Sequence, residues 1–317
     1  MLKYLIIQLD DSSASFCHYP NLNSASRLMP LNTLKEALIW SMKENLSIQI
    51  LYPDYALPQE YLETVNMVDR TDIVNSQCTD TYLKESADVL IFNKWEDLAL
   101  PKIIADVTYV MRTTFDDLIS HSEVMKALMM EVMRLNVVFT DLPDMDEADQ
   151  AKYLKFLEDI SLTIKSEYAR NHAVQLNLLT DRILLDKMNN CNAGDESITL
   201  CPDGKFYICP AFYSDGMSVG DLASRPNVRN PQLYRLSHAP LCRICDAFQC
   251  RRCVWLNHNA TLEVNTPSHQ QCVMAHIERN ASQKLLANIR ELGMFMPGKD
   301  IPNINYLDPL DIIVNKS

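Results

Sequence analysis

The sequence predicts an α/β protein, with a partial barrel of the (βα)6 type followed by a small cysteine-rich domain that contains a β-hairpin. In residues 1–180, short apolar runs alternate with longer amphipathic stretches, as in parallel strands joined by helices. All six glycines and eight of the ten cysteines follow residue 190. Residues 1–190 hold 29 acidic and 17 basic residues and so account for the whole net charge of −12. We therefore expect a barrel over residues 1–180, a cysteine-rich domain over 181–280, and a C-terminal helix and extended tail over 281–317.

The expected strands are short apolar runs that end in acidic or turn residues. They are Tyr4–Leu9, Ser47–Leu51, Val89–Phe92, Val107–Met111, Asn136–Phe139 and Val174–Leu178. The helices expected between them are Leu31–Glu44, Pro58–Met67, Thr114–Arg134 and Glu147–Arg170. Asn32 and Thr33 are N-cap signals for the first helix, and Asp144–Asp149 supplies acid where the last one begins. About six such units in this length fit an open barrel better than a closed one of eight strands.

The elements of the cysteine-rich region and of the tail carry turn and cap signals. In ITLCPDGKFYIC, a hairpin is expected with Pro202-Asp203-Gly204 as its turn. Ala281–Leu292 is expected to be a helix that ends at Gly293, and the proline-containing residues after it read as an extended arm.

The composition excludes several classes of function. An acidic protein without basic runs is a poor candidate for binding nucleic acid. Because residues 1–190 contain no glycine, they cannot form a glycine-rich phosphate loop or a dinucleotide fingerprint. No apolar run approaches the length of about 18 residues that spans a membrane, and MLKYLIIQLDDSS resembles a first strand more than a signal peptide. We therefore expect a cytoplasmic protein without a membrane partner, in which clustered cysteines bind metal more often than they form disulfides.

Eight cysteines within residues 191–272 are the main functional signal. They are Cys191, Cys201 and Cys209 around the hairpin, Cys242, Cys245, Cys250 and Cys253 in LCRICDAFQCRRC, and Cys272. Thiolates at this spacing repel one another unless a cation or a cluster neutralises them. Tetrahedral sulfur suits zinc and iron–sulfur clusters alike, but one zinc site within residues 242–253 would be cramped. We therefore expect these four cysteines to be shared between two sites; buried structural cysteines and disulfides are the less favoured alternatives.

The cysteine pattern resembles the SPASM domain of radical SAM peptide-modifying enzymes. The match consists of CNAG at Cys191, PDGKFYIC ending at Cys209, the two Cys-x2-Cys pairs, Cys272, and GDL at 220–222. The resemblance implies two auxiliary [4Fe–4S] clusters. Mapped by position, the first would be held by Cys191, Cys209 and Cys253, and the second by Cys242, Cys245, Cys250 and Cys272. With three ligands, the first site would keep an open iron or take Cys201 as well. Four residues separate Cys245 from Cys250 and two separate Cys250 from Cys253, where the family usually has five and three. The division of ligands within this group therefore stays open.

The same resemblance implies a radical SAM-like barrel before the domain, but its hallmark is missing. In the family, a Cys-x3-Cys-x2-Cys loop after the first strand holds the cluster that binds S-adenosylmethionine. The corresponding loop here, DDSSASFCHYPNLNSASRL, has Cys17 alone, beside His18 and Tyr19. The glycine-bearing strand that holds the methionine end of the cofactor has no equivalent either. We therefore expect a degenerate radical SAM protein with no residues for S-adenosylmethionine and no radical SAM catalysis. The whole chain also resembles the CXXX repeat peptide maturase family, which is associated with a true radical SAM enzyme and a cysteine-repeat peptide.

Three functions are compatible with these features. The first is an accessory iron–sulfur protein in ribosomal-peptide maturation, with the precursor peptide or a radical SAM enzyme as its partner. The second is an enzyme that uses an open first cluster to bind a substrate thiolate. The third is a structural zinc protein that mediates interactions.

Other residues carry weaker signals, and no catalytic residue is assigned. Arg243, Arg251 and Arg252 could stabilise an anionic cluster or orient a peptide carboxylate, or they could be solvated surface charges. Cys17 and Cys78 are isolated in the sequence and are expected to be core or partly exposed thiols, although the Cys17 loop would face the former active site.

Overall fold

The computed structural model describes residues 2–20, 26–98, 104, 106–141, 146–188, 190–293 and 300–301. Its strands form one open ten-stranded sheet in the order β10-β9-β8-β1-β2-β3-β4-β5-β6-β7. The strands are β1 Tyr4–Gln8, β2 Ser47–Leu51, β3 Arg70–Asn75, β4 Val89–Phe92, β5 Thr108–Thr113, β6 Arg134–Phe139, β7 Gln175–Leu176, β8 Ser197–Leu200, β9 Lys205–Tyr207 and β10 Ser218–Asp221. From β8 through β1 to β7 the strands are parallel, whereas β9 and β10 are antiparallel additions at one edge. The expected α/β class is confirmed, and the sheet is not closed.

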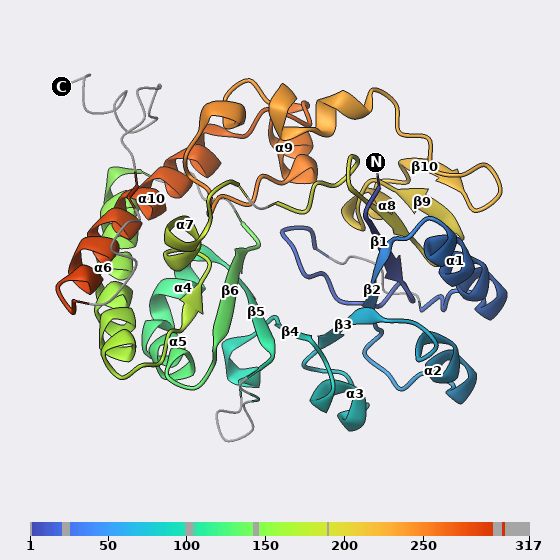
Figure 1. Cartoon of the computed structure of the whole chain (residues 1–317), viewed down its shortest axis with the longest axis horizontal. Helices are drawn as coiled ribbons and strands as arrows, with labels where there is room; N and C mark the ends of the chain where they lie inside the picture. The colour runs from blue at the N-terminus through green and yellow to red at the C-terminus, as the bar shows by residue number, and fades with distance from the viewer. Residues whose placement is uncertain are drawn as a thin grey trace.

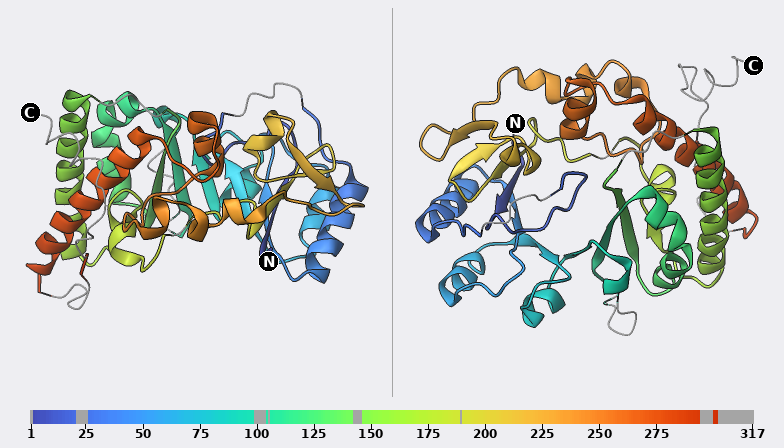
Figure 2. Two further views of the ribbon diagram at one scale, coloured as in Figure 1. Left: turned by 90° about the horizontal axis from the view of Figure 1, so that it is seen from above. Right: turned by 180° about the vertical axis from the view of Figure 1, so that it is seen from behind.

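The helices are α1 Leu31–Lys43, α2 Gln59–Val65, α3 Thr81–Glu85, α4 Phe115–Ser120, α5 Ser122–Met129, α6 Glu147–Ala169, α7 Thr180–Leu184, α8 Ala211–Ser214, α9 Val254–Thr261 and α10 His269–Arg290. Helices α1 to α6 lie on the outer, convex side of this curved sheet, whereas α8 lies beside the hairpin strands and α9 lies on the open side (Figure 1). The segment between β10 and α10 runs along the open side of the sheet, from the β10 edge to the pair α6 and α10, as the views from front and back both show (Figures 1 and 2). No helix in the described ranges is both long and apolar enough to cross a bilayer.

Several elements differ from the sequence expectations. The helix expected over Thr114–Arg134 is two short helices that meet at His121, and Arg134 already belongs to β6. The last helix begins at His269 rather than at Ala281, because Ser268 caps it: its hydroxyl accepts a hydrogen bond from the Gln271 N–H at 3.2 Å. The expected extended arm lies almost entirely outside the described residues.

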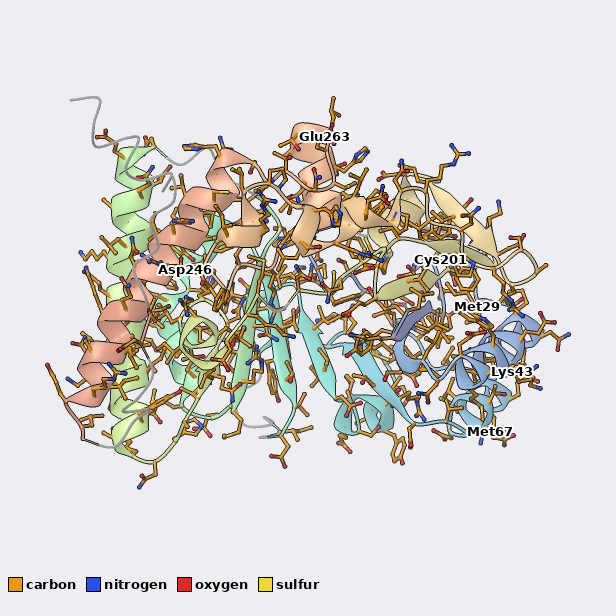
Figure 3. The ribbon with its side chains drawn as sticks, turned by 45° about the horizontal axis from the view of Figure 1, so that its top comes forward. Met29, Lys43, Met67, Cys201, Asp246 and Glu263 are labelled. Carbon is orange, nitrogen blue, oxygen red and sulfur yellow. The ribbon has the colours of Figure 1, made fainter. Side chains whose placement is uncertain are left out.

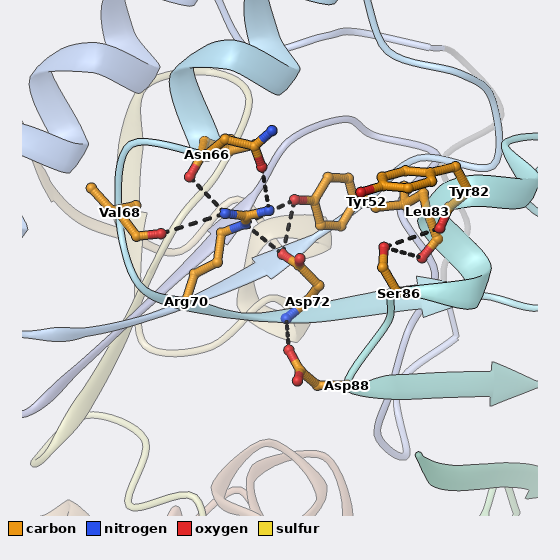
Figure 4. Close-up of polar contacts among 10 residues, drawn as sticks. Tyr52, Asn66, Val68, Arg70, Asp72, Tyr82, Leu83, Ser86 and Asp88 are labelled. Atoms are coloured by element: carbon orange, nitrogen blue, oxygen red, sulfur yellow. Dashed lines mark hydrogen bonds and ion pairs between the residues drawn. The ribbon is translucent and has the colours of Figure 1, made fainter. Parts of the chain in front are cut away.

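Strand β3 was not expected, because charged side chains interrupt its apolar pattern. Arg70 and Asp72 lie on it, and their charges are satisfied by a local network (Figure 4). The Arg70 Nε donates to Asp72 Oδ1 at 2.7 Å, and the Tyr52 hydroxyl donates to the same oxygen at 2.9 Å. The Asp72 backbone N–H donates to Asp88 Oδ2 at 2.7 Å. Neighbouring elements therefore supply the partners that permit a polar strand in the middle of the sheet.

The inner, concave face of the sheet carries an apolar patch that the chain itself covers. The patch consists of Ile6, Leu51, Ile73, Ile91, Val110 and Val138, one residue from each of β1 to β6. Ala14 and Phe16, from the loop that follows β1, pack against these side chains. The loop after the first strand thus lies inside the open barrel.

Candidate functional site

Residues 242–253, here called the cysteine loop, are fixed at their centre by a buried ion cluster. Asp246 has no exposed surface, and its Oδ2 accepts hydrogen bonds from Arg279 Nε at 3.0 Å and from Arg182 Nη2 at 3.3 Å. The Arg182 guanidinium also lies 4.4 Å from the centre of the Phe248 ring. These contacts join the loop to α7 and α10, and Figure 3 shows Asp246 beside α10. Such buried pairs are costly to break, so the cluster fixes the loop in place.

The second half of the loop is anchored residue by residue. The Gln249 amide donates to the Ala275 carbonyl of α10 at 2.5 Å. Arg251 donates to Asn136 Oδ1 on β6 at 2.9 Å, and Arg252 donates to the carbonyl of Tyr234 at 2.9 Å. Each anchor leads to a different element, so the cysteines between them have defined positions.

Four cysteines, here called the second group, line one pocket: Cys242, Cys245, Cys250 and Cys272. His276 lines it too, with its Nε2 3.6 Å from Cys245 Sγ. Burial raises the pKa of Cys242 to about 11, and burial together with the thiols of Cys242 and Cys245 raises the pKa of Cys272 to about 12. The four cysteines predicted as the second ligand set therefore lie around one pocket. Because burial favours their neutral form, these thiols would lose their protons only beside a positive charge such as a metal.

Three further cysteines, here called the first group, meet near the hairpin: Cys191, Cys209 and Cys253. Burial raises the pKa of Cys209, and the nearby thiols of Cys253 and Cys191 raise it further. Burial and the Cys191 thiol raise the pKa of Cys253 to about 12. Cys253 is the N-cap of α9, where its sulfur accepts from the Leu256 N–H at 3.4 Å. Cys191 retains solvent access, yet protein atoms surround it closely enough that desolvation raises its pKa as well.

Gly194 shapes the chain beside Cys191. Its φ of +84° lies in the left-handed region, and a Cβ atom there would come within 2.7 Å of the Tyr234 ring. Tyr234 also supplies the carbonyl that holds Arg252, so the sequence CNAG and the cysteine loop are packed together at this point.

The cysteines outside the two groups differ from one another. Cys78 is buried in the core between the sheet and its outer helices. Cys201 is fully buried in an apolar cluster with Tyr207 and Phe212, and its thiol donates a weak bond to Gln8 Oε1 at 3.9 Å; Figure 3 shows it beside the hairpin strands. Cys17, expected to be isolated, instead lies close enough to the first group that the thiols of Cys191 and Cys253 add to the rise in its pKa that burial causes.

Of the three arginines singled out in the sequence, Arg251 and Arg252 lie at the site, and Arg252 has the smaller exposed fraction. Arg252 is 3% exposed, so the expectation of a solvated surface charge does not hold for it, whereas Arg243 is exposed. Arg252 lines the pocket of the second group, and it interacts electrostatically with Cys242 and Cys250 on one side and with Cys191 and Cys253 on the other. Within the part of the chain that the structure describes, its Nε has no hydrogen-bond partner. A buried, unsatisfied N–H between two sets of thiols indicates space for an acceptor.

The donor sets fit an iron–sulfur cluster better than one metal ion. Among the described residues, no three His, Cys, Asp or Glu side chains are arranged to hold a metal ion. A zinc site draws four ligands to about 2.3 Å from one centre, whereas in a cluster each thiolate binds a separate iron and the sulfurs lie further apart. The all-thiolate groups, the apolar walls that Met188 and Ala239 give the second group, and the unpaired Arg252 N–H fit an anionic cluster.

Comparisons with known proteins extend this description to the whole fold. No protein-family model matches the sequence, and no curated protein matches it significantly. Among solved structures, the chain is similar to native anSMEcpe with bound AdoMet and Kp18Cys peptide, with a TM-score of 0.63, 12% identity, and coverage of 90% of this chain and 99% of that one. The same protein with the Cp18Cys peptide gives a TM-score of 0.62 and 12% identity, over 92% of this chain and 100% of that one. At this identity the likeness concerns the fold, and it confirms the radical SAM/SPASM-like fold that the cysteine pattern implied.

Proposed function

We propose that the chain is an accessory iron–sulfur protein in the maturation of a ribosomally made, cysteine-rich peptide. In this proposal it binds the precursor peptide, a partner radical SAM enzyme or both, in the cytoplasm, without itself cleaving S-adenosylmethionine. The observation that carries the proposal is the convergence of two cysteine groups on one loop, beside an inner sheet face that a single-cysteine loop covers. The peptides bound to anSMEcpe support a peptide as the partner.

Seven cysteines would hold two [4Fe–4S] clusters in this proposal. Cys191, Cys209 and Cys253 would bind the first, and Cys242, Cys245, Cys250 and Cys272 the second. Bound clusters supply one-electron transfer at a potential set by nearby charge, hydrogen bonds and solvent. Arg252, buried between the two groups, would stabilise added negative charge on either side of it. Met188 and Ala239 would keep water from the second group.

A pocket at the carboxyl ends of β6 and β7 is where we propose that a segment of the peptide binds. Ligands of parallel sheets bind at this edge of the strands. The pocket also contains Cys250, so a bound segment would contact the second group. Its walls combine apolar and polar side chains: Val137, Phe139, Leu178, His18, Asn177, Arg251 and Glu278. Burial raises the pKa of Glu278 to about 7, and Tyr153 donates to its Oε1 at 2.7 Å. Near neutral pH the pocket can therefore offer either a carboxyl donor or a carboxylate acceptor.

The test combines cofactor analysis with binding. The full chain, purified without oxygen, is incubated with S-adenosylmethionine and a strong reductant, and then with a cysteine-repeat precursor peptide and a candidate radical SAM partner enzyme. We expect iron and sulfide in the protein, no 5′-deoxyadenosine, and co-purification with the peptide or the enzyme. Formation of 5′-deoxyadenosine by the chain alone would contradict the accessory role.

Two other functions make different predictions. The solvent access of Cys191 favours an enzyme with an open first cluster, and such a cluster would change its spectrum when a thiol-containing peptide binds. A structural zinc protein would contain zinc and no sulfide even when it is purified without oxygen.

A further inference from the structure

The loop that follows β1 is held in place by hydrogen bonds between side chains and backbone carbonyls that join it to β5 and β6. Arg112, on β5, donates from Nε to the Cys17 carbonyl at 2.9 Å and from Nη2 to the Tyr19 carbonyl at 2.7 Å. His18 Nδ1 lies 2.7 Å from the Phe139 carbonyl, at the end of β6. One side of the loop packs on the inner sheet face through Phe16. The position of Cys17 is therefore defined from several sides.

The opposite side of this loop faces the first cysteine group. The Tyr19 ring meets the Trp255 ring edge-on, with centres 6.4 Å apart, and Trp255 is two residues after Cys253. The Cys17 thiol interacts electrostatically with Cys191 and Cys253, and the Cys209 thiol in turn interacts with Cys17. The ring contact places the Cys17 loop beside the segment that carries Cys253, and all three members of the group lie within electrostatic range of Cys17.

We infer that Cys17 is the fourth thiolate ligand of the first cluster, together with Cys191, Cys209 and Cys253. This inference rests on the iron–sulfur assignment in the proposed function. On ligation, the Cys17 thiol releases its proton to solvent and its sulfur donates a lone pair to iron, so the step requires neither an oxidant nor a reductant. Arg252, whose charge interacts with cysteines of both groups, has a buried Nε without a hydrogen-bond partner among the described residues, which fits an anionic acceptor between the groups.

Cys201, the extra ligand considered from the sequence, is placed differently. Its thiol is directed to Gln8, and its electrostatic neighbours are Asp203, Cys209 and Asp11. Cys201 therefore interacts electrostatically with one member of the first group, whereas Cys17 interacts with all three.

The inference changes the chemistry of the site. With Cys17 as a ligand, both clusters have four protein thiolates, and the first has no open iron for a substrate thiolate. The loop that binds the S-adenosylmethionine cluster in radical SAM enzymes would instead complete a SPASM-like site here.

The test compares Cys17→Ala with two matched variants, Cys201→Ala and Cys78→Ala, after anaerobic reconstitution with iron and sulfide. Two [4Fe–4S] clusters contain about eight irons per chain. We expect Cys17→Ala to lose between one and four of about eight irons and to show the paramagnetic signal of a three-iron cluster or of a single remaining cluster. Cys201→Ala and Cys78→Ala should retain wild-type iron. Wild-type iron content and spectra in Cys17→Ala would overturn the inference.

A measurement on the wild-type protein covers the case in which the variant does not fold. Iodoacetamide labelling is followed by mass spectrometry before and after a chelator removes the iron. Cys17 should become reactive together with Cys191 when the iron leaves, and equal reactivity of Cys17 before and after would contradict its ligation. If the wild-type protein itself contains no iron or sulfide, the proposed function fails; if it contains two clusters and Cys17 is unaffected, only this inference fails.

Discussion

Removing the Asp246 carboxylate should destabilise the protein severely, because this one side chain is an ion-pair partner of two buried arginines. Asp246 is 0% exposed, Arg182 is 1% exposed and Arg279 is 7% exposed as whole residues. Breaking a buried ion pair by removing one partner costs about 3–5 kcal/mol. Because two guanidinium groups lose the same carboxylate in Asp246→Ala, we expect the loss at or above the upper end of that range, which is a large part of a typical domain's stability of about 5–15 kcal/mol.

Urea denaturation of the metal-free chain, followed by circular dichroism, measures this effect. Asp246→Asn keeps the size and an acceptor oxygen and should lose less, since part of each hydrogen bond survives. The control is Lys284→Ala, which breaks a pair with Glu158 whose side chains are 59% and 53% exposed. Such surface pairs contribute about 0–1 kcal/mol. If Asp246→Ala were no more destabilising than Lys284→Ala, the account of the cysteine loop as a preformed structure would be wrong.

Other substitutions test the site from different directions. Arg252→Met should lower the reduction potential of the bound clusters by tens of millivolts in a redox titration, because a buried positive charge stabilises the reduced state. For a one-electron couple, about 59 mV corresponds to a tenfold change in the equilibrium constant. The control is Arg243→Met, at an exposed position, which should shift the potential much less. The pKa of Glu278 is raised to about 7, so the folded state binds this proton more tightly than the unfolded state and stability should fall as the pH rises from about 4.5 to 7. Glu278→Gln should remove up to about 3 kcal/mol of that pH dependence in denaturation experiments, and an unchanged profile would refute the assignment. Gly194→Ala should destabilise the protein and reduce iron loading, since its φ is +84° and the new Cβ meets the Tyr234 ring; normal loading would show that this contact does not shape the first group.

The sheet was predictable wherever hydrophobic pattern alone decides a strand. The six expected strands correspond to β1, β2, β4, β5, β6 and β7. Strand β3 was missed because Arg70 and Asp72 depend on partners in neighbouring elements, which no local pattern reveals. Arg134 was assigned to a helix for the same reason: its partner Asp181, at 2.9 Å, is distant in the sequence.

The cysteine groups, like the sheet, were predictable from the sequence only in part. Spacing and family resemblance grouped cysteines that the structure also places near one another, because the members of each group are close in sequence or part of a recognisable pattern; that they are cluster ligands stays a prediction. Cys17 reaches the first group only because its loop crosses the inner face of the sheet, where Arg112 holds its backbone. Arg252 could not be separated from Arg243 in the sequence, since only the packing of the cysteine loop makes one buried and the other exposed.

The central claim is that two iron–sulfur clusters occupy the two cysteine groups, and the metal and sulfide content of the chain tests it most directly. In protein purified and reconstituted without oxygen, the account predicts about eight irons and about eight sulfides per chain, with little zinc. Stoichiometric zinc without sulfide would contradict it.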